Sequence, residues 1–282
     1  MSGSASSLLL ALDPSLPMPL VMGILNVTPD SFSDGGVHYA PAAAIEAAMR
    51  MVEEGAAIID IGGESTRPGA GAVTVEQELA RVAPVIEEIR RRNAIPISLD
   101  TRKAAVARAG LAAGANVIND VSSLRFDPEM AEVVAAHRVP VILMHMRGEP
   151  ETMQQMTDYD EVVNDVASEL AGFRDRAVAA GIDPARILVD PGIGFAKTFE
   201  QNLELLARCG ELRSIGPVVI GASRKAFVGH LTGRPSGMAR MAGSLAAVAS
   251  AFRGKAAVVR VHDVRETVDF LKVMRAIEER AR

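Results

Sequence analysis

Several residue types and patterns are rare in this 282-residue chain, and each narrows the classes of protein it can belong to. A single cysteine, Cys209, excludes a disulfide framework or a cysteine-based zinc site and fits a reducing compartment, so we expect a cytoplasmic protein. No apolar run approaches the roughly 18 residues that a membrane span needs. Lys and Arg number 30 against 35 Asp and Glu, and this net charge of −5 argues against nucleic acid or an anionic membrane as the main partner.

The first 19 residues lack the features of a secretory signal peptide. They contain a short apolar stretch at residues 8–10, but no basic segment precedes it and no long apolar segment follows. We expect residues 1–19 to form a Ser- and Pro-rich tail of low order. The whole chain is 49% hydrophobic and 23% charged, which is typical of a folded globular protein with a large core.

Short apolar stretches rich in Val and Ile alternate with Ala-rich amphipathic stretches along the rest of the chain. The apolar stretches, which we expect to form strands, are residues 20–27, 57–61, 95–99, 116–121, 139–145, 187–190, 218–222 and 257–261. The predicted helices are residues 42–54, 75–92, 103–113, 128–137, 159–180, 199–209, 239–252 and 265–280. Alternation of this kind indicates right-handed βαβ units and a parallel sheet, and eight such units close a barrel. The sequence therefore predicts a single (β/α)8 TIM barrel over residues 20–282.

An open, doubly wound sheet is the alternative architecture. Its dinucleotide fingerprint, G-x-G-x-x-G after a strand, is incomplete here, because residues 192–197 read GIGFAK. A phosphate-binding G-x-x-x-x-G-K-[ST] loop is also missing from the sequence, and no Pro-, Gly- and Ser-rich linker divides the middle of the chain. These absences favour the barrel.

A hydrogen-bonding side chain stands at the end of every predicted strand. For any one strand, the ordinary polarity of loops is a sufficient explanation, but a barrel brings all eight ends to one mouth. We therefore interpret the series as a functional site. Its members are Asn26, Asp60, Asp100, Asn119 with Asp120, His145, Asp190, Ser223, and Arg260 with His262.

Three of these side chains, Asp100, Asn119 and Asp190, are predicted to line one pocket. A buried carboxylate needs a hydrogen-bond donor, and a flat heterocycle with several N–H groups supplies such donors. The alternative is that Asp100 and Asp120 cap the helices that follow them. For Asp120 we favour that structural role.

Basic residues follow the last two predicted strands. Ser223, Arg224 and Lys225 follow the seventh strand, and Arg260 and His262 lie at the eighth. Loops at these places in barrels commonly bind phosphate, and Arg and Lys donate charge-assisted hydrogen bonds to phosphate oxygens. A solvated basic loop is the simpler alternative. Lys225 has a further alternative role as the Schiff-base nucleophile of an aldolase.

The loops after the first two strands, residues 28–36 and 62–69, are rich in Gly, Pro, Ser and Asp and longer than a simple turn. Loops of this kind often act as mobile lids that exclude water. Asn26 lies just before the first loop, where its carbonyl oxygen is a candidate ligand for Mg²⁺.

Five segments resemble the signatures of the dihydropteroate synthase family. They are MGILNVTPDSFSDGG (22–36), DIGGESTRPG (60–69), DPGIGF (190–195), SRK (223–225) and RVHDV (260–264). The resemblance extends in order from about residue 20 to the C-terminus. The segment at 144–150 follows the family only loosely, because Arg147 and Glu149 stand where neutral residues are expected, so we assign it no chemistry.

The resemblance implies a TIM-barrel transferase of folate biosynthesis. Such an enzyme joins 6-hydroxymethyl-7,8-dihydropterin diphosphate to 4-aminobenzoate in the presence of Mg²⁺, and gives 7,8-dihydropteroate and pyrophosphate. The family is commonly dimeric, and the helix at residues 239–252 is dominated by small apolar residues, so we expect a homodimer.

The resemblance also implies a role for individual side chains. The pterin would be bound by Asp100, Asn119, Asp190 and Lys225, and the diphosphate by Arg260, His262 and Thr66, with Asn26 as the Mg²⁺ ligand. The aminobenzoate would be surrounded by Phe32, Ser65, Arg67, Pro68, Phe195, Ser223 and Lys225, with Thr66 nearby.

The mechanism we expect is dissociative, with the diphosphate leaving before the amine attacks. Arg260 and His262, with Mg²⁺, would stabilise the negative charge that develops on the departing diphosphate, and Lys225 is counted among the catalytic residues. Asp34 would act as a counter-charge to the carbocation. Two other pterin barrels remain possible from the sequence: a methyltetrahydrofolate-dependent methyl transferase and a non-catalytic pterin-binding relative. Neither would need both the basic cluster and the two long loops.

Overall fold

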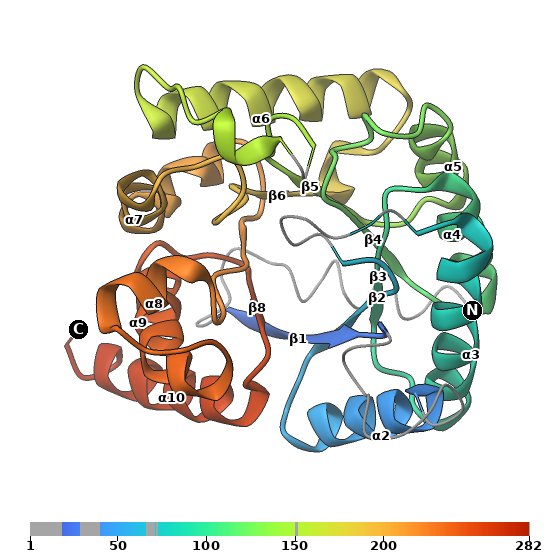
Figure 1. Cartoon of the computed structure of the whole chain (residues 1–282), viewed down its shortest axis with the longest axis horizontal. Coiled ribbons are helices and arrows are strands. Elements are labelled where there is room, and N and C mark those ends of the chain that lie inside the picture. Colours follow the sequence, from blue (N-terminus) through green and yellow to red (C-terminus); the bar gives the residue numbers. More distant parts are fainter. Residues whose placement is uncertain (1–18, 29–39, 66–70, 72, 150–151, 282) are drawn as a thin grey trace.

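The computed structural model describes residues 19–28, 40–65, 71, 73–149 and 152–281 and confirms the predicted (β/α)8 barrel (Figure 1). Parallel strands in the order β6-β5-β4-β3-β2-β1-β8-β7 form the sheet. A parallel bridge between Val189 and Val218 joins β6 to the segment before β7 and so brings the sheet's edges together. The strands are β1 (Leu20–Asn26), β2 (Ile58–Gly62), β3 (Ile97–Asp100), β4 (Val117–Asp120), β5 (Val141–Met144), β6 (Ile187–Asp190), β7 (Val219–Ile220) and β8 (Val258–Val261).

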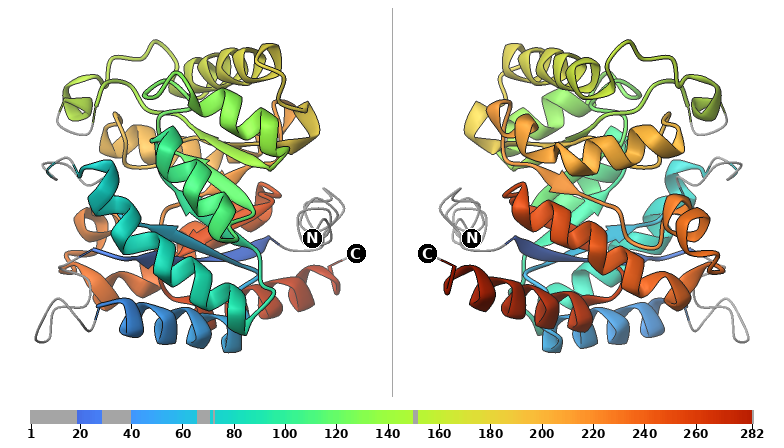
Figure 2. Two further views of the ribbon diagram at one scale, coloured as in Figure 1. Left: turned by 90° about the vertical axis from the view of Figure 1, so that its right-hand side faces the viewer. Right: turned by 90° about the vertical axis from the view of Figure 1, so that its left-hand side faces the viewer.

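Helices surround the strands on the outside of the barrel (Figures 1 and 2). They are α2 (Ala40–Glu53), α3 (Val75–Arg92), α4 (Ala104–Ala113), α5 (Met130–His137), α6 (Val162–Ala179), α7 (Phe199–Ala207), α8 (Ala226–Thr232), α9 (Met241–Arg253) and α10 (Val264–Glu278). Short 3₁₀ turns lie at Met153–Gln155, Pro184–Arg186, Cys209–Ser214 and Gly237–Arg240. Helix α8 was not predicted, because seven residues are too few to show a helical period. Within the described residues, no helix has the length and apolar character needed to cross a membrane.

Capping side chains fix where two of the helices begin. Thr74 accepts a hydrogen bond from the Gln77 backbone N–H, and the Gln77 side chain accepts one from the Thr74 N–H, at 3.2 and 3.1 Å. The same reciprocal pair, Thr198 with Gln201, starts α7. Such boxes satisfy N–H groups that the first turn leaves without an intrahelical partner. They make the entry into α3 and α7 a property of the local sequence.

The barrel interior changes from apolar to polar along the strands. A layer of fully buried apolar side chains fills its lower part, and each comes from a different strand: Met22, Ile58, Val117, Ile142, Leu188, Val219 and Val258. Side chains two residues apart on a strand face the same side. Two residues further on, four of these strands carry Asp60, Asn119, Asp190 and Arg260. The pleat therefore places a polar floor directly above the apolar layer.

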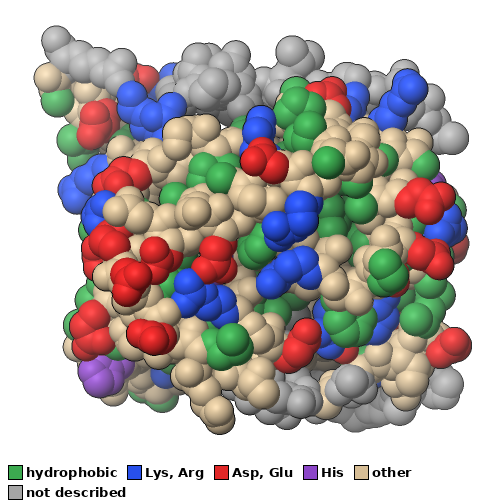
Figure 3. Space-filling view, turned by 90° about the horizontal axis from the view of Figure 1, so that it is seen from above, with side chains coloured by type: hydrophobic (Ala, Val, Ile, Leu, Met, Phe, Trp, Pro, Cys, Tyr) green, Lys and Arg blue, Asp and Glu red, His purple; other side chains and the backbone are tan. Residues whose placement is uncertain are grey.

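The outer surface mixes charges of both signs. Figure 3, a view onto one side of the barrel, shows acidic and basic side chains interspersed on that face.

Candidate active site

Arg260 is the central cation of the polar floor. Its Nε donates to Asp60 Oδ2 at 2.6 Å, and its Nη2 donates to Asp100 Oδ2 at 2.8 Å. Asn119 Nδ2 approaches the two Asp60 carboxylate oxygens at 3.4 and 3.3 Å. Because four strands, β2, β3, β4 and β8, supply these groups, the barrel wall holds them without help from the loops. The carboxylates and the guanidinium neutralise part of one another's charge, as buried ions require.

Asp60 is a site residue that sequence reasoning noted as a strand end but assigned no role. Strand β2 runs on to Gly62, and Gly62, not Asp60, pairs in register with Asp100. Asp60 therefore lies one layer deeper in the barrel, with no exposed surface. A charged residue within an apolar stretch was the signal that could have identified it.

Asp190 and Lys225 are oppositely charged groups that lie close enough to shift each other's pKa. Burial raises the pKa of Asp190, and the neighbouring Lys225 opposes that rise. Burial lowers the pKa of Lys225 to about 8, with Asp190 opposing the fall. Lys225 Nζ donates to the Ile193 carbonyl and lies 4.6 Å from the centre of the Phe195 ring. The structure thus brings Lys225 and Phe195 together, as the sequence predicted.

The carboxyl group of Asp100 has a perturbed pKa as well. Burial raises it, and the Arg260 guanidinium opposes the rise. The helix-capping alternative for Asp100 is wrong, because its carboxylate faces Arg260, and the first N–H of α4, that of Ala104, donates to Asp127 at 2.8 Å. Raised carboxyl and lowered ammonium pKa values together are common at functional sites.

Ser223 and His262 lie side by side at the ends of β7 and β8. The His262 backbone N–H donates to Ser223 Oγ at 3.2 Å, and His262 Nδ1 lies 3.1 Å from the same oxygen. Arg224, between Ser223 and Lys225, has a φ of 59° and forms an ion pair with Asp263. Lys225, and not Arg224, is therefore the cation of this loop that joins the pocket.

Arg240 and Ser244 hold the loop that carries Lys225. Arg240 Nη1 donates to the carbonyl oxygens of Arg224 and Lys225 at 3.1 and 3.3 Å. Ser244 Oγ accepts the Arg224 N–H at 2.9 Å. This part of α9 therefore supports the site from outside the barrel.

The capping role expected of Asp120 is wrong, because Asp120 stabilises the turn after β4 and does not cap α5. Its carboxylate accepts hydrogen bonds from Ser122 N, Ser122 Oγ and Leu124 N at 2.7, 2.6 and 2.9 Å. These three donors account for a fully buried carboxylate outside the pocket.

Arg147 and Glu149, the charged residues that depart from the family pattern after β5, form hydrogen bonds with neighbouring segments. Arg147 Nε donates to Glu169 of α6 at 2.9 Å, and its guanidinium lies 3.8 Å from the centre of the Tyr159 ring. Glu149 accepts a hydrogen bond from Arg102 at 2.6 Å. We find no contact of either side chain with the polar floor within the described part of the chain.

Five of the predicted site residues lie outside the described residues: Phe32, Asp34, Thr66, Arg67 and Pro68. Ser65, just before this gap, is half-buried. The stem of its loop is fixed by Lys103, whose Nζ donates to Glu64 at 2.8 Å and to the fully buried Glu78 at 2.5 Å. The base of the second loop is thus anchored to α3 and to the segment before α4.

Asn26 is the last residue of β1 and is half-buried. No group of three or more His, Cys, Asp or Glu side chains suited to hold a metal ion occurs among the described residues. Mg²⁺ usually retains several waters and binds one or two protein oxygens together with substrate phosphates. A single amide oxygen at the mouth fits that mode of binding, whereas a site formed by protein ligands alone does not fit.

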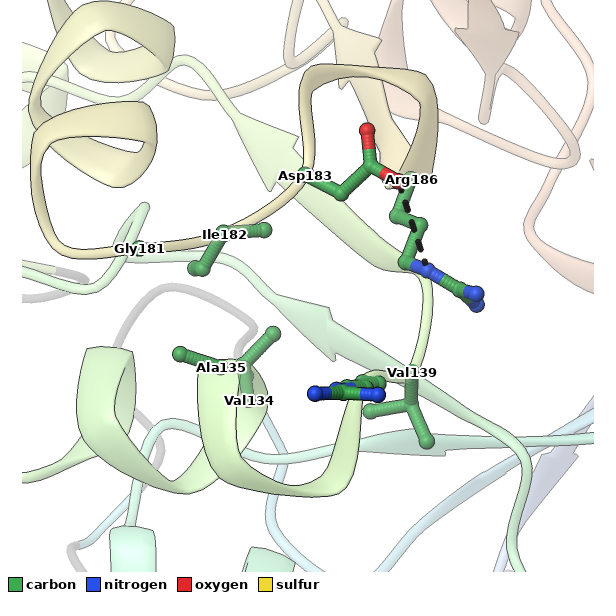
Figure 4. A pocket seen from close by; sticks show the side chains of 8 residues that line it. Val134, Ala135, Val139, Gly181, Ile182, Asp183 and Arg186 are labelled. Atoms are coloured by element: carbon green, nitrogen blue, oxygen red, sulfur yellow. Dashed lines mark ion pairs between the residues drawn. The ribbon is translucent and has the colours of Figure 1, made fainter.

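A separate pocket of about 280 Å³ lies at the opposite end of the barrel (Figure 4). It is formed by the end of α5, the segment before β5 and the segment before β6, and includes Val139, Asp183 and Arg186. These residues precede their strands, so the pocket is remote from the carboxyl ends where the polar floor lies.

Comparison with known proteins gives one consistent result. The profile of the family described as "Pterin binding enzyme" matches residues 22–262. The chain is 48% identical to the dihydropteroate synthase of Synechocystis sp. over 258 residues, which cover 91% of this chain and 89% of that one. It is 48% identical to the Escherichia coli K12 enzyme of the same name over 264 residues, which cover 93% and 92% of the two chains.

Solved structures agree with this result. Dihydropteroate synthase of Xanthomonas albilineans with 4-aminobenzoic acid is 50% identical, with a TM-score of 0.88 over 95% of this chain and 94% of that one. A structure of the same enzyme in complex with 7,8-dihydropteroate is 47% identical, with a TM-score of 0.85 over 95% of each chain.

Proposed function

The chain belongs to the dihydropteroate synthases, within the family of pterin-binding enzymes, and we propose how its site performs the condensation. The substrates are 6-hydroxymethyl-7,8-dihydropterin diphosphate and 4-aminobenzoate, and the products are 7,8-dihydropteroate and pyrophosphate. Relatives of the same name have been solved with 4-aminobenzoic acid and with 7,8-dihydropteroate, which supports these substrates.

The observation that carries the proposal is the polar floor. Asp100, Asn119 and Asp190 offer carboxylate and amide oxygens at the carboxyl ends of β3, β4 and β6, and Arg260 donates a hydrogen bond to Asp100. A pterin ring presents several N–H donors on one edge, so these acceptors match it. Lys225, beside Asp190, supplies a donor for a ring carbonyl or nitrogen.

We propose that the reaction is dissociative. The bond between the pterin methylene carbon and the diphosphate oxygen breaks first, and its electron pair leaves with the diphosphate. The aminobenzoate nitrogen then forms the new C–N bond and loses a proton. An aromatic amine is neutral near pH 7, so no strong base is needed.

The diphosphate in this proposal lies over the ends of β7 and β8. The contacts with Ser223 hold His262 at the end of β8, where its ring would donate a hydrogen bond to the oxygens of the departing diphosphate. Arg260 is already bonded to two carboxylates, so its contribution to the diphosphate comes from its remaining N–H groups. Asp34 would act as a counter-charge to the carbocation, and the loops after β1 and β2 would keep water from it.

Asn26 would hold Mg²⁺ through its amide oxygen. When bound there with the diphosphate, the ion would supply positive charge toward the leaving group. The corresponding test is pterin diphosphate binding by Asn26→Ala, measured by calorimetry with and without Mg²⁺. The proposal expects the variant to lose the dependence on Mg²⁺.

Aminobenzoate-dependent pyrophosphate release tests the function as a whole. The purified chain is incubated with the dihydropterin diphosphate and Mg²⁺, with and without 4-aminobenzoate, and the pterin product is identified by mass. Release that requires aminobenzoate and yields dihydropteroate supports the proposal. Pterin binding without product would instead favour the non-catalytic alternative. The methyl transferase and aldolase alternatives find no support among the relatives described above.

We also propose that the chain is a homodimer and that it acts in the cytoplasm. Helix α9 buries Ser244, Ala247, Val248 and Ala251 against its own barrel, which accounts for part of its small-residue composition. Ala242 and Ala246 on the same helix are exposed and remain available to a second copy. Light scattering coupled to size exclusion would give the mass in solution, with twice 29.8 kDa expected.

A further inference from the structure

A buried lysine outside the proposed substrate contacts lies under the loop that follows β6. Lys197 is 4% exposed and stands immediately before Thr198, the cap of α7. Its Nζ lies 2.9 Å from the Phe195 carbonyl oxygen, 3.2 Å from the Gly192 carbonyl oxygen and 3.0 Å from His145 Nδ1. Sequence patterns did not predict a buried lysine at this position, because a lysine after a glycine-rich segment is usually solvated.

These three contacts match the hydrogen-bonding capacity of an ammonium group. A protonated lysine has three N–H donors, and the two carbonyl oxygens and a ring nitrogen are three acceptors. His145 accepts at Nδ1 when its proton is on Nε2, and Nε2 lies 3.1 Å from Glu169 Oε2. Burial lowers the pKa of His145 to about 4, so the ring is neutral in the physiological range. Glu169, His145 and Lys197 therefore form one continuous hydrogen-bonded chain.

The charges around Lys197 come from four segments. Burial lowers its pKa to about 7; Asp190 and Glu169 favour the ammonium form, whereas Lys225 and Arg147 disfavour it. In these surroundings, the Lys197 ammonium group donates charge-assisted hydrogen bonds to the backbone carbonyl groups around it and so fixes their positions.

Every carbonyl of the loop from 192 to 196 has a hydrogen-bond donor. Lys197 Nζ donates to the carbonyl oxygens of Gly192 and Phe195, and Lys225 Nζ donates to the carbonyl oxygen of Ile193. The two remaining partners lie in the segment before α6: Gln154 Nε2 donates to Gly194 O at 3.3 Å, and Tyr159 Oη donates to Ala196 O at 3.0 Å. The two lysines therefore bind adjacent peptide groups of the same loop, Lys225 from the side of the pocket and Lys197 from the buried side.

The loop in turn fixes the surroundings of Lys225. The Phe195 ring lies under its ammonium, and a Cβ added at Gly194 would come within 3.0 Å of its Cδ. A displacement of this loop would therefore move the Phe195 ring, which the family resemblance places at the aminobenzoate. It would also move Lys225, which the resemblance places at both substrates.

We propose that Lys197, held by His145 and Glu169, is a positioning residue that sets the aminobenzoate half of the site by fixing the loop at residues 192–196. The inference rests on the proposed function for the identity of the second substrate. Asp190 and Lys225 of the pterin half contact the loop. The pterin half nevertheless depends on it less, because Asp60, Asp100, Asn119 and Arg260 are held by strands and by one another.

The test compares Lys197→Met with Lys272→Met in the full chain. The first removes the three donors and retains a long apolar stem, and the second makes the same change at an exposed lysine. Steady-state kinetics at pH 6.5 give KM for each substrate. We expect Lys197→Met to raise KM for 4-aminobenzoate about tenfold and to leave KM for the pterin diphosphate within twofold, with no change in Lys272→Met.

Two further measurements keep the result interpretable. Hydrogen–deuterium exchange without substrates reports the loop directly, and we expect faster exchange at residues 192–196 in Lys197→Met. Glu169→Gln weakens the far end of the chain of hydrogen bonds, and it should shift KM for 4-aminobenzoate two- to threefold in the same direction. It serves as the test if Lys197→Met does not fold.

The outcomes separate this inference from the proposed function. An equal rise in both KM values, or a loss of thermal stability alone, would overturn the positioning role. Unchanged exchange of the loop would overturn it as well. If the unaltered chain releases no pyrophosphate, the proposed function fails, and the exchange data still decide whether Lys197 fixes the loop.

Discussion

Asp60 provides the sharpest test of how the polar floor is stabilised. We predict that Asp60→Asn lowers the free energy of unfolding by about 3 kcal/mol. The carboxylate is fully buried, and its Oδ2 lies 2.6 Å from Arg260 Nε. The substitution retains the size of the side chain and one acceptor oxygen, so it removes mainly the charge.

The magnitude follows from two opposing considerations. Unit charges at about 4 Å interact by about 4 kcal/mol at an effective dielectric constant of about 20. Breaking a buried pair typically costs about 3–5 kcal/mol, because the remaining ion stays uncompensated. Here Arg260 retains Asp100 at 2.8 Å, which reduces the loss. The new amide N–H₂ would also face the Asn119 amide, and an unsatisfied buried donor costs about 1–3 kcal/mol.

Urea unfolding followed by circular dichroism measures the effect, and a fall in Tm of roughly 5 °C should accompany it. Glu279→Gln, which breaks the exposed pair with Arg275 at 2.7 Å, is the control and should change stability by less than about 1 kcal/mol. A double-mutant cycle with Arg260→Met isolates the pair. A loss no larger than that of the control, or a coupling energy near zero, would refute the reasoning.

Three further predictions concern the loops and the cations. Gly192→Ala should destabilise the protein by more than about 3 kcal/mol in thermal unfolding, because its φ is 67° and the added Cβ would meet the His145 carbonyl oxygen at 2.0 Å. Gly233→Ala has a φ of 66° but open space around it, and a loss of about 1 kcal/mol there would separate crowding from backbone strain. The pH profile of kcat/KM for the pterin diphosphate should fall above about pH 8, where Lys225 loses the proton with which it donates; Lys225→Arg should move that fall to higher pH, and an unchanged profile would assign it to another group. Asp34→Asn should lower kcat far more than pterin affinity, and an equal loss in both would argue against the counter-charge role.

The sequence predicted most of the fold because each unit has a local signature. The apolar stretch at 187–190 and the capped amphipathic stretch at 75–92 match β6 and α3 to the residue. Strand β7, predicted at 218–222, contains only Val219–Ile220, since a strand ends where its partners' hydrogen bonds end. That limit depends on neighbours distant in the chain and is invisible to a local pattern.

The residues of the candidate site likewise divide into those that a local sequence pattern identifies and those whose roles depend on distant parts of the chain. Motif residues such as Asp100, Asn119 and Lys225 were identified from strand ends and from the family resemblance. Asp60 was noted as a strand end but given no role, because its partners are about 60 and 200 residues away in the chain. Lys197 was not identified, because its role arises from a fold-dependent contact with His145. Sequence spacing does not report such contacts, whereas barrel closure creates them.

The apolar layer beneath the floor has an electrostatic consequence. Neither water nor salt ions can approach Asp60, Arg260 and Asp100 through seven tightly packed hydrocarbon side chains, so these charges are screened from the mouth alone. A ligand that covers the mouth removes that screening, and each ion pair beneath it then becomes stronger. Bound pterin is thus expected to stiffen the floor on which it rests, and its affinity should depend only weakly on ionic strength once the mouth is closed.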